Sequence, residues 1–515
     1  MEIVDEQIRK DILAASGNII VSASAGSGKT TIMVKKILKK LNEISDHKTV
    51  AAITFTIKAT EEIKKKSEQI DGNNKFVVMT NDSFIEYEII RPFLKDAFGE
   101  MYNNDFVISY EHSVKSSSFD GCLNTLEKSN KLGTYHNIRR NFKFELAKKV
   151  LERSTAAQEY FKSKYAMIFL DEYQDSDIDM HNLFMYIKNV LLIDLFIVGD
   201  GKQAIYLWRG AQRDIFNQLE NEGMQRFELV TNFRSHFEIV NYANLIHNYS
   251  HFRNDYPKEV THVVHCRTND YVSSINELCE SNVLDKNKNI TIIANINRDA
   301  KEISDNLNAR GFNFVFIPKT PLDDGSENAN VLKVIACYLL DDNYSVFDIA
   351  EVLRVEQERT VLNKIDNLLK PLKKLVPLSS NQTKDDIKSS FFESITNFNN
   401  FFGTNITNDE QVLLLDTVTN KYFYPAFIKS NDLHKVMTVF GSKGLEFNQV
   451  ISFAKYYNFS DESKKNNHYV CVTRAEEKFV MMEGELEKYS EQINSKLREL
   501  GIGSESTTFK LINHI

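Results

Sequence analysis

Short apolar runs alternate along the chain with segments whose apolar positions recur at helical spacing. Residues 19–21 and 50–55 form two such runs, and the segments 32–41 and 58–67 that follow them have the pattern of amphipathic helices. A continuous apolar run is typical of a strand that is buried on both faces of a sheet. Strands and helices in alternation therefore predict a parallel sheet covered by helices.

The same alternation of apolar runs and helical segments recurs farther along the chain and is interrupted twice. Further apolar runs of strand length lie at 167–170, 195–198, 290–293, 312–317, 436–440, 450–453 and 479–482. Segments 85–164 and 346–431 instead carry longer helical patterns. The expected fold class is α/β, with two parallel-sheet cores that each contain a mainly helical insertion. In chain order we expect first core 1–84, insertion 85–164, first core 165–228, second core 229–345, insertion 346–431 and second core 432–515.

Composition excludes several classes of protein. With 42% hydrophobic and 26% charged residues, the 515-residue chain has the composition of a folded globular protein. It contains no apolar run of the roughly 18 residues that a membrane span needs, and its acidic segment 1–6 lacks the apolar centre of a secretory signal. The five cysteines form no CxxC pair, so they suggest neither a zinc site nor disulfides, and they fit a reducing cytoplasm.

The charge of the chain is unevenly distributed. A net charge of −8 argues against a protein that coats nucleic acid by charge alone. Lysines and arginines nevertheless gather in segments 29–66 and 128–153. These stretches predict either surfaces that bind a phosphate backbone or helix faces that are exposed to solvent, and the sequence leaves both interpretations open.

Segment 23–31 reads Ala-Ser-Ala-Gly-Ser-Gly-Lys-Thr-Thr and lies between a predicted strand and a predicted helix. In a P-loop, glycines let successive backbone N–H groups and the helix N-terminus surround phosphate groups. Lys29 would contact the β- and γ-phosphates, and the Thr30 hydroxyl would ligate Mg²⁺. A glycine-rich turn before a helix is the alternative interpretation. The Lys-Thr pair at the required place favours the nucleotide site.

Two adjacent carboxylates, Asp171 and Glu172, follow the apolar run 167–170. Such a pair is costly to bury at a strand end without a cation. We assign Asp171 to Mg²⁺ and Glu172 to the role of general base towards water. An Asp-Glu pair often only caps the next helix, but the P-loop upstream favours the catalytic interpretation.

The order of motifs along the chain resembles that of superfamily 1 helicases of the UvrD, Rep and PcrA type. The segments that carry this resemblance are Gln7, 23–31, 53–59, 171–175, 198–211, 231–235, 438–447 and 469–475. The resemblance implies two RecA-like domains that each carry an insertion, in agreement with the pattern above. It also implies hydrolysis of ATP (or dATP) with Mg²⁺.

The resemblance implies a set of nucleotide contacts. These are Gln7, Ala25, Gly26, Ser27, Gly28, Lys29, Thr30, Thr31, Phe233 and Glu446. Within this set, Gln7 would read the adenine, Phe233 would stack on it, and Glu446 would bind the ribose.

The resemblance also implies catalytic roles for residues outside segment 23–31 and the Asp171–Glu172 pair. Gln203 would sense the γ-phosphate and relay its presence to the DNA. Arg234 and Arg474 would reach from the second core to the phosphates, where two guanidinium groups stabilise the charge on the transferring phosphoryl group. Hydrolysis would then require closure of the two cores, and this motion would move the DNA.

The DNA contacts implied by the resemblance are Phe55, Thr56, Lys58, Tyr206, Trp208 and Arg209. Phe55 and Trp208, the sole tryptophan of the chain, would stack on single-stranded bases, each stack contributing about 1–3 kcal/mol. From local sequence alone, burial of Phe55 beside Ile53 is the alternative. Three departures from the family pattern, Ile57, Asp82 and Phe440, fall on the DNA-facing side.

Within this family the chain most resembles the UvrD-like helicase subunit of the bacterial Gabija anti-phage system. The strings 80–84 and 439–447 and the short second insertion carry this narrower resemblance. It implies a GajA-like partner nuclease of the overcoming-lysogenization-defect family, together with 3′ to 5′ polarity. Two functions stay open: a DNA translocase or helicase, and a regulatory subunit that senses DNA ends and controls the nuclease without unwinding. A housekeeping repair helicase would carry a longer second insertion.

Overall fold

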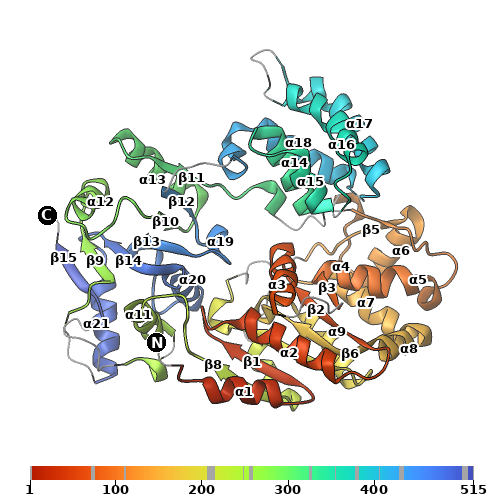
Figure 1. The fold of residues 1–515 in the computed structure, drawn as a ribbon, viewed down its shortest axis with the longest axis horizontal. Coiled ribbons are helices and arrows are strands. Elements are labelled where there is room, and N and C mark those ends of the chain that lie inside the picture. Colours follow the sequence, from red (N-terminus) through yellow and green to blue (C-terminus); the bar gives the residue numbers. More distant parts are fainter. Residues whose placement is uncertain are drawn as a thin grey trace. The chain divides into compact units, whose positions relative to one another are not determined.

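The computed structural model describes two compact units, Met1–Ser235 and His236–Ile515 (Figure 1). The described residues are 3–70, 76–109, 112–137, 139–205, 215–247, 249–253, 259–323, 328–353, 355–376, 378, 382–404, 406–428, 434–501 and 508–513. Both units are built on a sheet whose strand pairs are all parallel. The predicted α/β fold class is thereby confirmed.

The first unit contains a six-stranded sheet in the order β3-β2-β6-β7-β1-β8. The strands are β1 (Ile19–Ala23), β2 (Thr49–Thr54), β3 (Val77–Thr80), β6 (Tyr165–Leu170), β7 (Asp194–Gly199) and β8 (Gln225–Leu229). The helices α1 (Glu6–Ala14), α2 (Lys29–Glu43), α3 (Ile57–Ile70) and α9 (Ile178–Asn189) connect or flank them. The carboxyl ends of β1, β6 and β7 lead into segments 23–31, 171–175 and 200–203, so the sheet brings these motifs to one edge.

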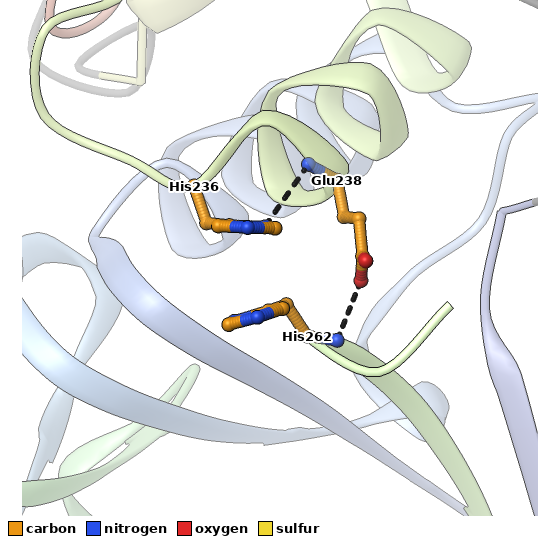
Figure 2. A group of neighbouring side chains, drawn as sticks. All are labelled: His236, Glu238 and His262. Atoms are coloured by element: carbon orange, nitrogen blue, oxygen red, sulfur yellow. Dashed lines mark hydrogen bonds between the residues drawn. The ribbon is translucent and has the colours of Figure 1, made fainter. Parts of the chain in front are cut away.

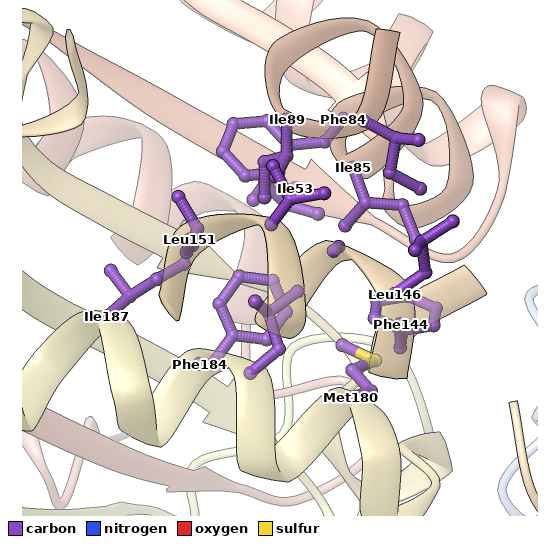
Figure 3. Close-up of a cluster of buried hydrophobic side chains, with 14 of the residues drawn as sticks. Ile53, Phe84, Ile85, Ile89, Phe144, Leu146, Leu151, Met180, Phe184 and Ile187 are labelled. Carbon is purple, nitrogen blue, oxygen red and sulfur yellow. The ribbon is translucent and has the colours of Figure 1, made fainter. Parts of the chain in front are cut away.

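Helices lie between β3 and β6 of the first unit. They are α4 (Asn81–Ile85), the π-helix η1 (Glu86–Ile90), α5 (Arg91–Phe98), α6 (Phe119–Ser129), α7 (Phe142–Arg153) and α8 (Thr155–Lys164), with the short strands β4 (Val107–Ile108) and β5 (Lys131–Leu132). One buried apolar cluster joins Ile53 of β2, Phe84 of α4, Leu146 of α7 and Phe184 of α9 (Figure 3). These helices therefore share a core with one face of the sheet.

The other face of this sheet has its own core. Ile19, Val21 and Phe169 pack there with Met33 and Ile37 of α2. Successive side chains of a strand point to opposite faces, so neighbouring apolar residues of one strand supply both cores. This explains why the inner strands β1, β2, β6 and β7 are largely apolar.

The second unit contains a seven-stranded sheet in the order β11-β12-β10-β13-β14-β9-β15. Its strands are β9 (Val263–Arg267), β10 (Ile290–Ala294), β11 (Phe314–Phe316), β12 (His434–Thr438), β13 (Phe447–Phe453), β14 (Ala475–Glu483) and β15 (Lys510–Asn513). Its helices include α11 (Phe237–His247), α12 (Tyr271–Glu280), α13 (Asn297–Ala309), α19 (Val439–Ser442), α20 (Glu462–Val472) and α21 (Tyr489–Glu499). The predicted strand 436–440 ends at Thr438, because the Thr438 hydroxyl accepts from the Gly441 N–H and starts α19.

Five α-helices lie in the described part of the chain between β11 and β12. They are α14 (Ala329–Leu340), α15 (Val346–Leu353), α16 (Arg359–Leu375), α17 (Lys384–Phe402) and α18 (Asn408–Thr419). They have a buried apolar cluster of their own, which includes Ile335, Leu369, Phe391 and Leu414. Among the described residues, no helix combines the length and the apolar character that crossing a membrane requires.

Candidate nucleotide site

The loop between β1 and α2 has the backbone that its glycines permit. Gly26 and Gly28 have φ values of +70° and +80°, in the left-handed region that favours glycine. A Cβ atom on Gly26 would also lie 2.6 Å from Oδ1 of Asn232. The loop therefore needs glycine at position 26 both for its turn and for the close approach of a second segment.

Lys29 opens α2 and faces the carboxylates that follow β6. Its Nζ lies 3.0 Å from Oε1 of Glu172. Burial alone would lower the pKa of Lys29, but the charges of Glu172, Asp200 and Asp171 outweigh it and raise that pKa. Burial and the Glu172 charge together raise the pKa of Asp171 above its usual range. The site thus holds the Lys29 ammonium group among clustered carboxylates.

The backbone at Glu172 is strained. Its φ of +52° places a residue other than glycine in the left-handed region. Such conformations cost on the order of 1–3 kcal/mol and gather at functional sites. Here the strain turns the Glu172 side chain towards Lys29.

Buried hydrogen bonds connect the segment after β6 with the segment after β7. Gln174, which is buried, donates from Nε2 to Oε2 of Glu172, and its Oε1 accepts from the Asp200 N–H at 3.0 Å. The Asp200 carboxylate in turn accepts from Nε2 of Gln203 at 2.8 Å. Nζ of Lys202 donates to the Ser24 hydroxyl at 3.0 Å. Glu172 and Gln203 are therefore two ends of one polar chain.

The segment 230–235, which follows β8, is attached to the glycine loop. Nδ2 of Asn232 donates to the Ala25 carbonyl at 2.8 Å, and the Phe233 N–H donates to the Gly26 carbonyl at 2.9 Å. The Phe233 ring is 51% exposed, so one side of it remains available beside the loop.

An ion pair on α1 fixes the same region from the other side. The buried Asp5 accepts from the Val230 and Thr231 N–H groups and from Arg9. Arg9 also donates to the Ser27 carbonyl at 2.9 Å, and its guanidinium carbon lies 4.9 Å from the centre of the Phe233 ring. Arg9 and Phe233 thus face each other at the edge of the loop.

The residues of this loop fit a bound triphosphate. The Ser27 side chain is fully buried, and its hydroxyl has no hydrogen-bond partner in the described structure. Thr30 and Thr31 are half-buried in the first turn of α2, where backbone N–H groups have no helical acceptor. With Lys29 as the cation, and with the buried carboxylate of Asp171 as an oxygen ligand, the set also fits Mg²⁺.

Not every predicted residue joins this cluster. Gln7 is exposed, and its Nε2 donates to Asp11 within α1 at 2.8 Å. Phe55 is half-buried and packs against the core of the first unit, and Thr56 is exposed and caps α3 by accepting from the Ala59 N–H. Tyr206, Trp208, Arg209 and the side chain of Lys58 lie outside the described residues.

The two predicted arginine fingers fall in different units. Arg234 is half-buried and belongs to the first unit, although we expected it on the second core. Arg474 is buried in the second unit, where it donates to the carbonyls of Val470 and Leu445. Glu446 is exposed in the same unit, next to Leu445.

Sequence reasoning missed four residues of the site: Arg9, Gln174, Lys202 and Asn232. The pair Asp5 and Arg9, four apart at the start of a helix, was a signal for an ion pair. The other three lie inside the motif segments 171–175, 198–211 and 231–235, but the resemblance gave them no individual role. Their importance comes from contacts between segments far apart in the sequence.

Comparison with known proteins places the chain among DNA helicases. Residues 4–143 and 142–223 match the model of the UvrD/REP helicase N-terminal domain. The chain is 40% identical over 501 residues to the Gabija protein GajB of Bacillus cereus (strain VD045). This alignment covers 96% of this chain and 98% of that protein. It is 27% identical to the ATP-dependent DNA helicase PcrA of Staphylococcus epidermidis over 45% of this chain and 38% of that helicase. The ATP-dependent DNA helicase Rep of Buchnera aphidicola is 26% identical, over 48% of this chain and 44% of Rep.

Proposed function

The chain belongs to the UvrD-like helicases, in the group of the Gabija protein GajB, and we propose that it couples ATP hydrolysis to single-stranded DNA so as to control a partner nuclease. The observation that carries this proposal is the Lys29–Glu172 pair beneath a glycine-built phosphate loop. A phosphate-binding cation and a general base stand there in direct contact.

The geometry supports a simple hydrolytic sequence. Lys29 and the N–H groups of the loop bind the β- and γ-phosphates, and this draws Lys29 away from Glu172. Glu172 is then available to accept a proton from the water that attacks the γ-phosphorus. Asp171 and Thr30 would hold Mg²⁺, which neutralises charge on the phosphates. Arg234 and Arg474 would add positive charge to the transferring group.

The base of the nucleotide has a plausible platform. Phe233 and Arg9 face each other beside the loop, and both a ring and a guanidinium group stack well on a flat base. Gln7 would have to leave Asp11 to read the adenine. We propose that Arg9 and Phe233 hold the base and that Gln7 adds selectivity.

Coupling to DNA is proposed through the buried polar chain. Hydrogen bonds of Gln174 and Asp200 connect Glu172, the proposed general base, to Gln203. Gln203 lies five residues before Trp208. Fully satisfied buried networks have few alternative arrangements, so a change at one end displaces the other. These hydrogen bonds support the proposal that the rate of ATP hydrolysis depends on whether Trp208 contacts DNA.

A second candidate function, a regulatory ATPase without unwinding, is favoured by Asp82. This carboxylate stands where the family pattern has histidine, is more than half exposed, and lies 3.6 Å from Nζ of Lys143. Its exposed negative charge repels a phosphate backbone, and Lys143 cannot offset this repulsion fully because it is buried and also pairs with the buried Glu86 at 3.3 Å. Asp82 thus supports a weaker grip on duplex DNA than that of the longer helicases.

The deciding experiment uses the purified chain with and without a GajA-like nuclease. We expect hydrolysis of ATP that single-stranded DNA stimulates, that Lys29→Ala abolishes, and that Lys35→Ala, an exposed residue of the same helix, leaves intact. Hydrolysis indifferent to DNA would refute the proposal. Strand displacement on a tailed duplex distinguishes the helicase from the regulatory ATPase, and co-purification tests the nuclease partner.

A further inference from the structure

Three potential metal ligands meet in the second unit. His236 and Glu238 come from the start of α11, and His262 directly precedes β9 (Figure 2). One ring nitrogen of each histidine and one carboxylate oxygen of Glu238 all lie within 4.8 Å of one another. Two imidazoles and a carboxylate form a donor set that zinc and related divalent ions use in proteins.

The carboxylate of this cluster is held in place by backbone groups. Glu238 is 7% exposed, and its Oε2 accepts from the N–H groups of Thr261 and His262. These bonds fix the carboxylate beside the imidazoles and still leave lone pairs on both oxygens. A buried carboxylate is costly unless a positive charge lies near it. A divalent cation bound between Glu238 and the two rings would supply that charge.

The imidazole of His262 has the tautomer that a metal-binding histidine needs. Its Nδ1 is hydrogen-bonded to the Glu477 carbonyl, which can only accept, so the proton resides on Nδ1 and the lone pair on Nε2. The His236 ring packs face to face on it, with 3.5 Å between ring centres and 19° between planes. A ligand lone pair lies in the plane of its ring. Binding one ion with both histidines therefore requires the His236 ring to turn out of the stack.

A lysine near the cluster competes with a metal. Nζ of Lys478 donates to the Thr261 carbonyl at 3.0 Å and interacts electrostatically with Glu238. Its positive charge partly offsets the buried carboxylate. Removal of the Lys478 charge should therefore strengthen metal binding at this cluster. Metal binding at a distant surface site would not respond to this change.

The cluster adjoins the segments that carry both predicted fingers. His236 is two residues beyond Arg234, and its N–H donates at 2.7 Å to the carbonyl of Glu476, two residues beyond Arg474. We propose that His236, Glu238 and His262 form a binding site for a zinc-type divalent cation that fastens the start of α11 to β9 and β14. Metal binding is independent of the proposed function, whereas any effect on hydrolysis rests on it.

The test uses the untagged full chain, stripped with chelator and free of nucleotide, titrated with Co²⁺ by absorbance and with Zn²⁺ by calorimetry. We expect one ion per chain at this site and a rise in Tm on binding. His236→Gln and His262→Gln should each weaken binding about tenfold or more, and Lys478→Gln should tighten it. His47→Gln, at an exposed histidine, should leave binding unchanged.

Two results would overturn the proposal. One is the absence of a bound ion in the wild-type chain. The other is equal affinity in the wild type and both histidine variants. If a variant does not fold, X-ray absorption of the zinc-loaded wild type decides, because two imidazole ligands support the site and their absence refutes it. None of these measurements uses hydrolysis, so failure here is distinct from failure of the proposed function.

Discussion

The side-chain amide of Asn232 donates to the backbone carbonyl of Ala25 at 2.8 Å and so attaches the segment after β8 to the phosphate loop. Oδ1 of the same residue accepts from the N–H groups of Arg234 and Ser235. One buried side chain therefore sets both the loop and the backbone that carries a proposed finger. It can do so because Gly26 has no Cβ atom in its path.

Asn232→Ala should weaken nucleotide binding. It leaves the Ala25 carbonyl and two buried N–H groups without a side-chain partner, and a net loss of about 1–1.5 kcal/mol corresponds to roughly tenfold in affinity. Titration with a fluorescent ATP analogue measures the change. Asn308→Ala is the matched control, because Asn308 bonds to the backbone of Phe314 in the second unit. Equal nucleotide affinity in the two variants would contradict the link.

Arg9 and Gln7 should differ in what they contribute. Arg9 bonds to Asp5 and to the Ser27 carbonyl and faces Phe233, so Arg9→Ala should raise KM for ATP and GTP alike. Gln7 is exposed and bonded to Asp11, so Gln7→Ala should leave binding strength nearly intact and reduce only the preference for ATP over GTP. Hydrolysis at varied concentrations of both nucleotides measures this. A large loss of affinity in Gln7→Ala alone would reverse the assignment.

Trp208→Ala should lower affinity for single-stranded oligonucleotides and their stimulation of hydrolysis while leaving basal hydrolysis unchanged. One lost base stack is worth about 1–3 kcal/mol, which is roughly five- to 150-fold in affinity. Fluorescence anisotropy with a labelled oligothymidine gives the affinity. Trp208→Phe, which keeps an aromatic ring, should retain most of it. Unchanged binding in Trp208→Ala would remove this residue from the DNA interface.

The sequence predicts most inner strands of both sheets because these strands are largely apolar. It missed β8 (Gln225–Leu229), whose Gln, Arg and Glu fit an edge strand with one partner, β1. It also missed β9, because His265 and Arg267 interrupt its apolar pattern. His265 is nevertheless buried, since its Nε2 is satisfied by the Tyr242 hydroxyl. A polar residue that pairs across the fold is invisible to a local hydrophobic pattern.

The residues of the candidate site also divide into those that a local sequence pattern predicts and those that it does not. Lys29, Asp171 and Glu172 belong to contiguous motifs that follow predicted strands, so their meeting follows from the shared edge of a parallel sheet. Arg9 and Asn232 contact the loop through chain segments separated from it by 18 and 207 residues. Only the packing of α1 and of the segment after β8 brings them there. For the segment after β8, the resemblance indicated only that Phe233 and Arg234, the neighbours of Asn232, approach the nucleotide.

His265 should make the second unit sensitive to mild acid. Its ring is fully buried and packs on Phe509, and burial, followed by the charge of Arg267, lowers the pKa of His265 to about 3. In the unfolded chain this pKa is about 6.5. Between these values the unfolded state binds the additional proton, so the free energy of unfolding falls as the pH falls. At pH 5.5, one unit below the unfolded value, this single residue should remove about 1.4 kcal/mol. His468, also buried with a lowered pKa, acts in the same direction.

Hydrogen exchange of peptides from β9 at pH 7.5 and 5.5, corrected for the intrinsic exchange rate, measures this loss. His265→Gln keeps a group that can bond to Tyr242 but does not titrate, so its β9 peptides should lose about 1.4 kcal/mol less protection between the two pH values than those of the wild type. His47→Gln, at an exposed histidine, should behave as the wild type does. The same pH dependence in wild type and His265→Gln would show that His265 does not set the acid sensitivity of this unit.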